Sequence, residues 1–167
     1  MRKLIPLFFI LVACSGSHNE RRATTETTAR AFFEMYKTRQ DWQGFQDLFA
    51  EDLRFEDVIF RYTYDKPSFV AFYNWPDSLL KKHPDYPEVL VLEDLAFTDS
   101  TAIGRGHFTP FYYGNELHDD QEHMRFVIAM HVNEKGKISR QIDFIEYPPV
   151  FLKLAAESLL TDSLNQR

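Results

Sequence analysis

The chain has 167 residues, with 19 basic and 25 acidic side chains and a net charge of −6 at pH 7. The longest positive cluster is the short KKH stretch at 81–83, so the sequence argues against nucleic acid as a partner and against electrostatic adhesion to anionic lipid. Aromatic residues make up 16% of the chain, which is typical of a folded domain and excludes the disordered class.

The first fourteen residues predict a lipoprotein signal peptide. Arg2 and Lys3 form a short basic start, and residues 4–13 form an apolar run, which is shorter than the roughly 20 residues that span a bilayer as a helix. The run ends in the letters LVAC at 11–14, which resemble a bacterial lipobox. This resemblance implies cleavage before Cys14 and attachment of lipid to its sulfur.

Cys14 is the only cysteine, so an exported protein would have no internal disulfide partner for it, and acylation accounts for its presence. Losing Arg2 and Lys3 takes the net charge from −6 to −8. We expect a signal peptide at 1–13, a tether at 14–23 and one domain at 24–162, anchored to the membrane through Cys14. Ser15 is compatible with sorting to the outer membrane, facing the periplasm.

Two helices are predicted before the first strand. The first follows the tether, with Thr24 and Thr25 as candidate N-caps, and Asp41 caps the second. Residues at the i, i+3, i+4 and i+7 spacing predict their buried faces, which comprise Ala29, Phe32, Phe33 and Tyr36 in the first helix, and Trp42, Phe45, Leu48 and Phe49 in the second.

The period then changes to two, at Leu53, Phe55 and Ile59, which predicts a strand. Pro67 follows Asp65, as in the first turn of a helix, and Pro76 ends that helix. We expect this third helix to bury Phe69, Phe72 and Tyr73.

From residue 87 onward, long strands are predicted at 89–97, 101–113, 122–132 and 138–147, with turns at 99–100, 114–115 and 134–137. A final helix would place Phe151, Leu154, Ala155 and Leu159 on one face. Helices first and antiparallel strands afterwards indicate the α+β class. On the third long strand the even positions 124–132 are all apolar, which predicts a buried face. Its odd positions carry His123, Arg125 and His131, which favours a solvated face or a homodimer interface on the outer side of the sheet.

Several stretches resemble SnoaL-like proteins of the nuclear transport factor 2-like superfamily. They are FFEMY at 32–36, DWQGF at 41–45, LFAEDLRFED at 48–57 and GKISRQIDF at 136–144, and the resemblance spans most of residues 25–147. It implies N-terminal helices packed on a strongly bent antiparallel sheet, which forms a cone-shaped α+β barrel with an aromatic pocket. The segment 72–77 and the C-terminal helix lie outside the pattern.

The resemblance also implies isomerase, dehydratase, cyclase or hydrolase chemistry that uses acid–base pairs and no metal. Asp57 and Asp143 match the polar pocket positions of the family, and Arg61 and His107 are their candidate partners as electrophile and proton donor. Burial could raise the pKa of either carboxyl toward neutrality, as a base requires. The alternative interpretation, which has the stronger prior, is structural: Asp57 caps a strand end, Asp143 pairs with an arginine at the surface, and His107 makes an ordinary hydrogen bond.

Other clusters point less clearly to chemistry. Histidines at 107, 118, 123 and 131 lie near acidic residues, but neither HExxH nor paired-cysteine spacing occurs, so we expect no metal and no cofactor. Aromatic residues can form a wall for a flat or apolar ligand, although a phenylalanine-rich core is the explanation with the stronger prior. The candidates for a ligand pocket are Tyr62, Phe108, Tyr112 and Tyr113.

The sequence therefore supports three hypotheses. The first is a lipid-anchored envelope protein that binds a small, largely apolar molecule in a conical pocket, with or without catalysis. The second is an acid–base enzyme that uses Asp57 or Asp143. The third is an interaction module whose outer sheet face holds a partner in an envelope complex.

Overall fold

The computed structural model describes residues 13–119, 124–153 and 156. The predicted signal peptide, apart from its last residue, lies outside the described residues, as do His123, Leu154, Ala155 and Leu159. No helix within the described ranges is both long enough and apolar enough to cross a lipid bilayer.

Three helices, a 3-10 turn and nine strands make up the described fold. The helices are α1 (Ala13–Thr38), α2 (Trp42–Asp47), α3 (Lys66–Tyr73) and the 3-10 turn η1 (Trp75–Asp77), and residues 149–153 start a further helix. The six-stranded sheet has the order β2 (Tyr62–Tyr64), β1 (Phe49–Asp57), β9 (Ile138–Ile145), β8 (Arg125–Val132), β5 (Thr101–Phe108) and β4 (Leu90–Phe97). A three-stranded sheet has the order β3 (Leu80–Lys82), β6 (Phe111–Tyr113) and β7 (Glu116–His118).

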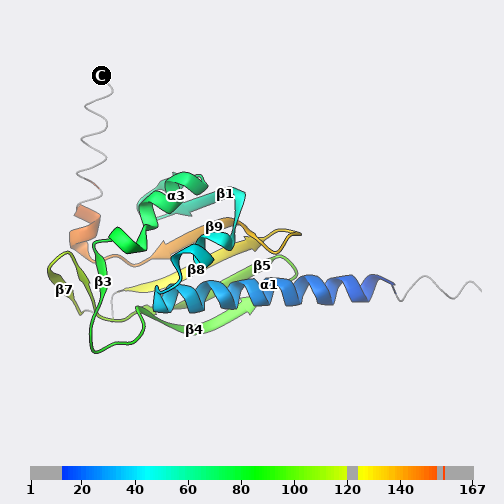
Figure 1. The fold of residues 1–167 in the computed structure, drawn as a ribbon, viewed down its shortest axis with the longest axis horizontal. Helices are drawn as coiled ribbons and strands as arrows, with labels where there is room; N and C mark the ends of the chain where they lie inside the picture. Colours follow the sequence, from blue (N-terminus) through cyan, green and yellow to red (C-terminus); the bar gives the residue numbers. More distant parts are fainter. Residues whose placement is uncertain (1–12, 120–123, 154–155, 157–167) are drawn as a thin grey trace, which may run out of the picture.

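All helices of the core cover one face of the larger sheet, which we call the inner face. Figure 1 shows α1 running along β8, β5 and β4, while α3 lies over β1. The close approach of α1 requires glycine at position 104 of β5, because a Cβ atom there would lie 2.2 Å from Cζ of Phe33. Gly106 has a different reason: a Cβ atom there would lie 1.9 Å from the carbonyl oxygen of Val91, on the neighbouring strand β4. Phenylalanine rings therefore make up much of the core between the helices and the sheet, and glycine at position 104 leaves room for one of them.

The α+β class, the helices on the sheet and the cone-shaped fold are confirmed. Asp41 caps α2 by accepting a hydrogen bond from the amide of Gly44 at 2.8 Å. Asp65 caps α3 in the same way, because its Oδ1 atom accepts from the amide of Ser68 at 3.0 Å. On β8 the even positions are buried and the odd positions are exposed or half-buried, as predicted. One pairing was not predicted: β1 and β9 run parallel, whereas the other neighbouring strands are antiparallel.

The prediction that the first helix starts after residue 23 is wrong, because α1 starts at Ala13 and includes the expected tether. Thr24 and Thr25 lie inside the helix instead of capping it. The Thr25 hydroxyl donates to the carbonyl of Asp99 at 2.8 Å, which ties α1 to the turn after β4. A helix that packing has already nucleated extends through polar neighbours at little cost, so apolar periodicity does not mark its start.

Several boundaries also differ. The predicted strand at 101–113 is divided between β5 and β6 by Thr109 and Pro110, because proline cannot donate to a sheet. Ile59 is 46% exposed in the turn after β1, and Phe72 is 46% exposed on α3, so neither is a core residue. The three-residue strands β2, β3 and β7 were not predicted, because so short a segment has too few positions to show alternation.

Candidate functional site

The open end of the cone contains a cavity of about 490 Å³. The end of α1, the segment from α3 to β3, strand β6 and the chain after β9 surround it. Most of its wall is aromatic, as a site for an apolar ligand requires. Of the four predicted pocket residues, Tyr62, Phe108 and Tyr113 line this cavity. Tyr112 does not, because it alternates to the opposite side of β6, where its ring stacks on that of His83 with centroids 5.6 Å apart.

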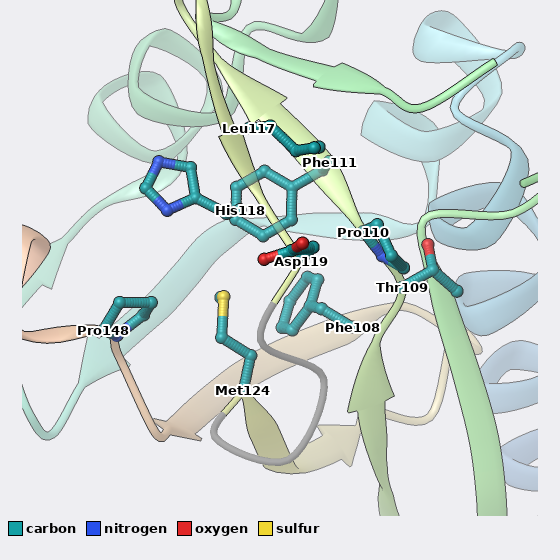
Figure 2. Close-up of a pocket in the computed structure, with 9 residues that line it drawn as sticks. All are labelled: Phe108, Thr109, Pro110, Phe111, Leu117, His118, Asp119, Met124 and Pro148. Atoms are coloured by element: carbon teal, nitrogen blue, oxygen red, sulfur yellow. The ribbon is translucent and has the colours of Figure 1, made fainter. Parts of the chain in front are cut away.

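A smaller hollow of about 120 Å³ adjoins this cavity. Figure 2 shows its lining, in which the Met124 side chain lies near the ring of Phe108. Phe108, Phe111 and Met124 line both spaces and so form the wall between them. The smaller hollow has about a quarter of the volume of the larger one, so the larger cavity is the candidate site.

The structure brings Asp57 and Asp143 together on the inner face of the sheet. They are opposite each other in the parallel register of β1 and β9, and they are only 1% and 0% exposed. No described arginine pairs with Asp143, so the alternative that placed it in a surface ion pair is wrong. The two carboxyl groups instead lie buried on adjacent strands of the inner face.

Each carboxyl group is separated from the cavity by a tyrosine that lines it. The hydroxyl of Tyr73 donates to Oδ2 of Asp143 at 2.8 Å, and the hydroxyl of Tyr147 donates to Oδ2 of Asp57 at 2.6 Å. Any ligand in the cavity therefore meets phenolic hydroxyls, while the carboxyl groups behind them set the direction in which those hydroxyls donate.

The other oxygen of each carboxyl group is held by protein donors. Oδ1 of Asp57 accepts from the amides of Ile59 and Phe60, at 3.0 and 2.8 Å, so Asp57 does cap the strand end as the structural alternative predicted. Oδ1 of Asp143 accepts from Nε2 of Gln141 at 2.8 Å. Among the described residues, Asp57 thus has two backbone donors, whereas Asp143 has none.

Burial raises the pKa of Asp143 to about 7, because the charged form loses its water; the hydrogen bonds from Gln141 and Tyr73 oppose the shift and the charge of Asp57 adds to it. Burial and the nearby Asp143 charge also raise the pKa of Tyr73 well above 10. The same two causes raise the pKa of Tyr36 to about 12. The site therefore combines neutral phenols with a carboxyl group that can change its charge near neutral pH.

Arg39 is the one cation that lines this cavity among the described residues. It follows the last residue of α1 and was not singled out from the sequence. Its guanidinium lies over the ring of Trp75, with Cζ 5.4 Å from the ring centroid. Burial lowers the pKa of Arg39 from its usual value, because the charged group is partly removed from water, although the fields of Tyr36 and Tyr73 oppose the shift.

The two predicted partners of the carboxyl groups lie elsewhere. His107 is on the outer side of β5, where its Nδ1 atom lies 2.9 Å from Oε1 of Glu93, so the structural interpretation of this residue holds. Arg61 is exposed in the turn after β1, at a positive φ of 58°. From the sequence, Tyr36 and Tyr73 were predicted as buried helix residues but not as site residues, and Arg39 was not predicted at all. A hydroxyl on an otherwise phenylalanine-rich helix face was the available signal for the two tyrosines, since a buried hydroxyl needs a partner.

No family model matches the sequence, and no curated protein matches it. Solved structures do match. A provisionally named SnoaL-like polyketide cyclase from Shewanella denitrificans has a TM-score of 0.60 at 14% identity, covering 87% of this chain and 100% of that one. A provisionally named ketosteroid isomerase from Kribbella flavida has a TM-score of 0.55 at 21% identity, covering 77% and 84%.

A nuclear transport factor 2-like protein of unknown function from Burkholderia pseudomallei has a TM-score of 0.55 at 16% identity, covering 81% of this chain and 95% of that one. Identities this low support a shared fold, but they do not support a shared activity. The likenesses, together with the helix-covered sheet and its cavity, show that this chain has the cone-shaped fold of SnoaL-like and nuclear transport factor 2-like proteins.

Proposed function

We propose that this protein binds a small, largely apolar molecule in the aromatic cavity at the open end of the cone. The observation that carries the proposal is the cavity itself: about 490 Å³, with a mostly aromatic wall and a few polar groups, Tyr36, Tyr73, Tyr147 and Arg39, among its lining. Binding sites for small molecules typically have this combination of apolar wall and few polar groups. The apolar wall would bury the body of the ligand, and the polar groups would orient it.

The test is to fill the cavity. Leu80→Trp places a large ring in the cavity wall, whereas Val127→Trp adds the same ring on the outer face of the sheet, where Val127 is 39% exposed. Calorimetric titration with an uncharged apolar probe, naphthalenemethanol, should give binding to the parent protein and the Val127 variant. The Leu80 variant should bind at least about tenfold more weakly. Equal binding by all three proteins would place the probe outside the cavity and contradict the proposal.

A specific observation also favours a second candidate, acid–base catalysis. Asp143 has a pKa of about 7 and is bonded to a hydroxyl that lines the cavity. Tyr73 could pass its proton to Oδ2 of Asp143 while it accepts a proton from the substrate at its own oxygen, and the reverse transfer would return that proton. A carboxyl group with a pKa near the working pH suits either direction.

Proton abstraction can be measured without the natural substrate. Apolar ketones incubated with the protein in deuterium oxide would exchange the hydrogens next to the carbonyl. Asp143→Asn should lower that exchange by at least about a hundredfold and leave the circular dichroism spectrum unchanged. Exchange that is the same in the parent and the variant would remove Asp143 from the mechanism.

Lipid anchoring at Cys14 and a position in the bacterial envelope belong to the same proposal, on the strength of the LVAC letters at 11–14. Expression in a bacterial host with an alkyne-labelled fatty acid would test both. The full chain should carry the label and sediment with membranes, whereas Cys14→Ser should carry none. An unlabelled parent protein would contradict the anchor.

The outer sheet face supports a proposal of homodimerisation. Ile103, Val127 and Phe144 leave 45%, 39% and 45% of their surfaces exposed there, on three neighbouring strands. Exposed apolar patches of this kind often mark interfaces. Sedimentation should give a dimer for the parent protein and a monomer for Val127→Asp, while a monomeric parent would contradict the proposal.

A further inference from the structure

Arg39 holds an unusual position at the end of α1. Its amide donates to the carbonyl of Met35 at 2.8 Å, which closes the last turn of the helix, and its φ is 53°. Helices commonly end on a residue in this left-handed region, and glycine takes it most easily because it has no Cβ. A residue with a Cβ atom adopts this conformation only at an energetic cost. The backbone conformation at position 39 therefore disfavours arginine, so the interactions of the Arg39 side chain are what must be explained.

The guanidinium of Arg39 has few protein partners. Nη1 donates to the carbonyl of Leu80 at 3.2 Å, and the group lies over the ring of Trp75. Nε is buried without a hydrogen-bond partner, and no carboxylate of the described residues pairs with the group. Arg39 is half-buried, and a cation that is partly removed from water without a counter-ion is destabilised; the same partial burial lowers its pKa.

The protein's own acidic groups near the cavity do not supply this counter-ion. Asp143 and Asp57 are bonded to Tyr73 and Tyr147 and to donors on their own strands. Asp77, which lines the cavity from η1, is exposed and accepts from Nδ2 of Asn74 at 3.1 Å. Each carboxyl group thus has other partners, and Arg39 remains the uncompensated charge in the cavity wall.

We propose that the cavity selects apolar molecules that carry a carboxylate, and that Arg39 binds this carboxylate. This inference rests on the proposed function, since it names the class of ligand for the same cavity. The planar guanidinium presents donors in a fork that matches the two oxygens of a carboxylate. Tyr36 lines the same cavity, and the aromatic wall would hold the apolar body.

A purely structural role for Arg39 would be to tie the end of α1 to β3 through Leu80. That hydrogen bond needs only one neutral donor, so it does not explain a charged fork whose Nε atom is unpaired. The two roles separate experimentally. A structural residue changes the binding of charged and neutral probes equally, whereas a carboxylate-binding residue changes the difference between them.

The experiment compares naphthoate with its uncharged counterpart naphthalenemethanol by calorimetric titration at about pH 6, where Asp143, with its pKa of about 7, is mostly protonated. The parent protein should bind naphthoate at least about tenfold more tightly. Arg39→Gln should remove this preference and keep the affinity for naphthalenemethanol within about twofold. Arg39→Lys, which keeps the charge and loses the fork, should lie between them.

The matched control is Arg125→Gln, which removes an exposed arginine on the outer face of β8 and should leave both affinities unchanged. Thermal unfolding of each variant verifies that it is folded. If naphthalenemethanol binds and naphthoate has no advantage, or if Arg39→Gln weakens both probes equally, the carboxylate proposal is overturned and the cavity proposal stands. If neither probe binds the parent protein, both are overturned.

Discussion

The inner and outer faces of the six-stranded sheet differ in what surrounds chemically similar residues. On the inner face Phe126 is 2% exposed, whereas on the outer face Phe144, from the adjacent strand β9, is 45% exposed. On the inner face Asp143 is buried and bonded to Tyr73 and Gln141. On the outer face Glu93 is bonded to His107, and both side chains are partly exposed. Burial, and not residue type, therefore decides which groups have altered chemistry.

The largest expected effect comes from the two phenylalanines. Phe126→Ala should lower the free energy of unfolding by about 3–5 kcal/mol, because it leaves a cavity among the rings of Phe33 and Phe108. In the monomer, Phe144→Ala removes the same atoms from an exposed site and should cost less than about 1 kcal/mol. Urea unfolding of the two variants measures the difference, and equal losses would mean that the outer face is covered in solution.

The pH dependence of stability separates the buried carboxyl group from the exposed ones. Asp143 has a pKa of about 7 in the folded chain and about 4 when unfolded. The unfolded chain therefore loses this proton first as the pH rises from 4, and the folded state loses stability until about pH 7. Above that pH the penalty is complete, on the order of 4 kcal/mol at most.

Asp143→Asn removes this penalty and keeps a carbonyl to accept from Gln141. The variant should be more stable than the parent at pH 8, and the difference should disappear near pH 4. Asp57→Asn is the comparison on the adjacent strand: it removes a charge that adds to the raised pKa of Asp143 and perturbs the contact with Tyr147, so any gain at high pH should be smaller than that of Asp143→Asn. Chemical denaturation at the two pH values decides the matter, and a variant that is less stable at pH 8 would contradict the high pKa.

A smaller effect is expected from the hydroxyl that covers Asp57. Tyr147→Phe leaves Oδ2 of this buried carboxyl group without its donor, which should cost about 1–3 kcal/mol. The control is Tyr62→Phe, in the wall of the same cavity, where no hydrogen bond involves the hydroxyl within the described chain, and it should cost less than about 0.5 kcal/mol. Thermal unfolding compares the two, and similar losses would show that the bond to Asp57 contributes little.

The buried face of β8 could be predicted from the sequence, because its alternation of apolar and polar residues is complete. The inner position of Asp143 was implied only by the family resemblance, and spacing alone did not decide between it and a surface position. The same alternation on β5 could have corrected the prediction that His107 lies in the pocket. Ala102, Gly104, Gly106 and Phe108 are the buried or small residues of β5, so the odd position 107 had to face outward.

Other features had no signal in one sequence. Arg39 follows a helix end without any spacing that would distinguish it, and its importance depends on Trp75 and on the cavity, which come from a later part of the chain. The N-terminal turns of α1 contain no apolar period, and the contacts that hold them involve polar side chains: Arg22 lies over the ring of Phe97, and His18 pairs with Asp99. Both features depend on tertiary contacts that local patterns do not encode.

The smallest expected effect is on the outer face of the sheet. It tests whether a hydrogen-bonded pair that is partly exposed contributes little to stability. Glu93→Gln keeps an oxygen that can accept from Nδ1 of His107, and the pair is partly exposed, with 46% of the Glu93 side chain and 28% of the His107 side chain accessible. Surface pairs of this kind contribute less than about 1 kcal/mol. The variant should therefore unfold within about 0.5 kcal/mol of the parent protein. A loss comparable to that of Tyr147→Phe would mean that this part of the sheet is buried in solution, as an interface between two copies of the chain would bury it.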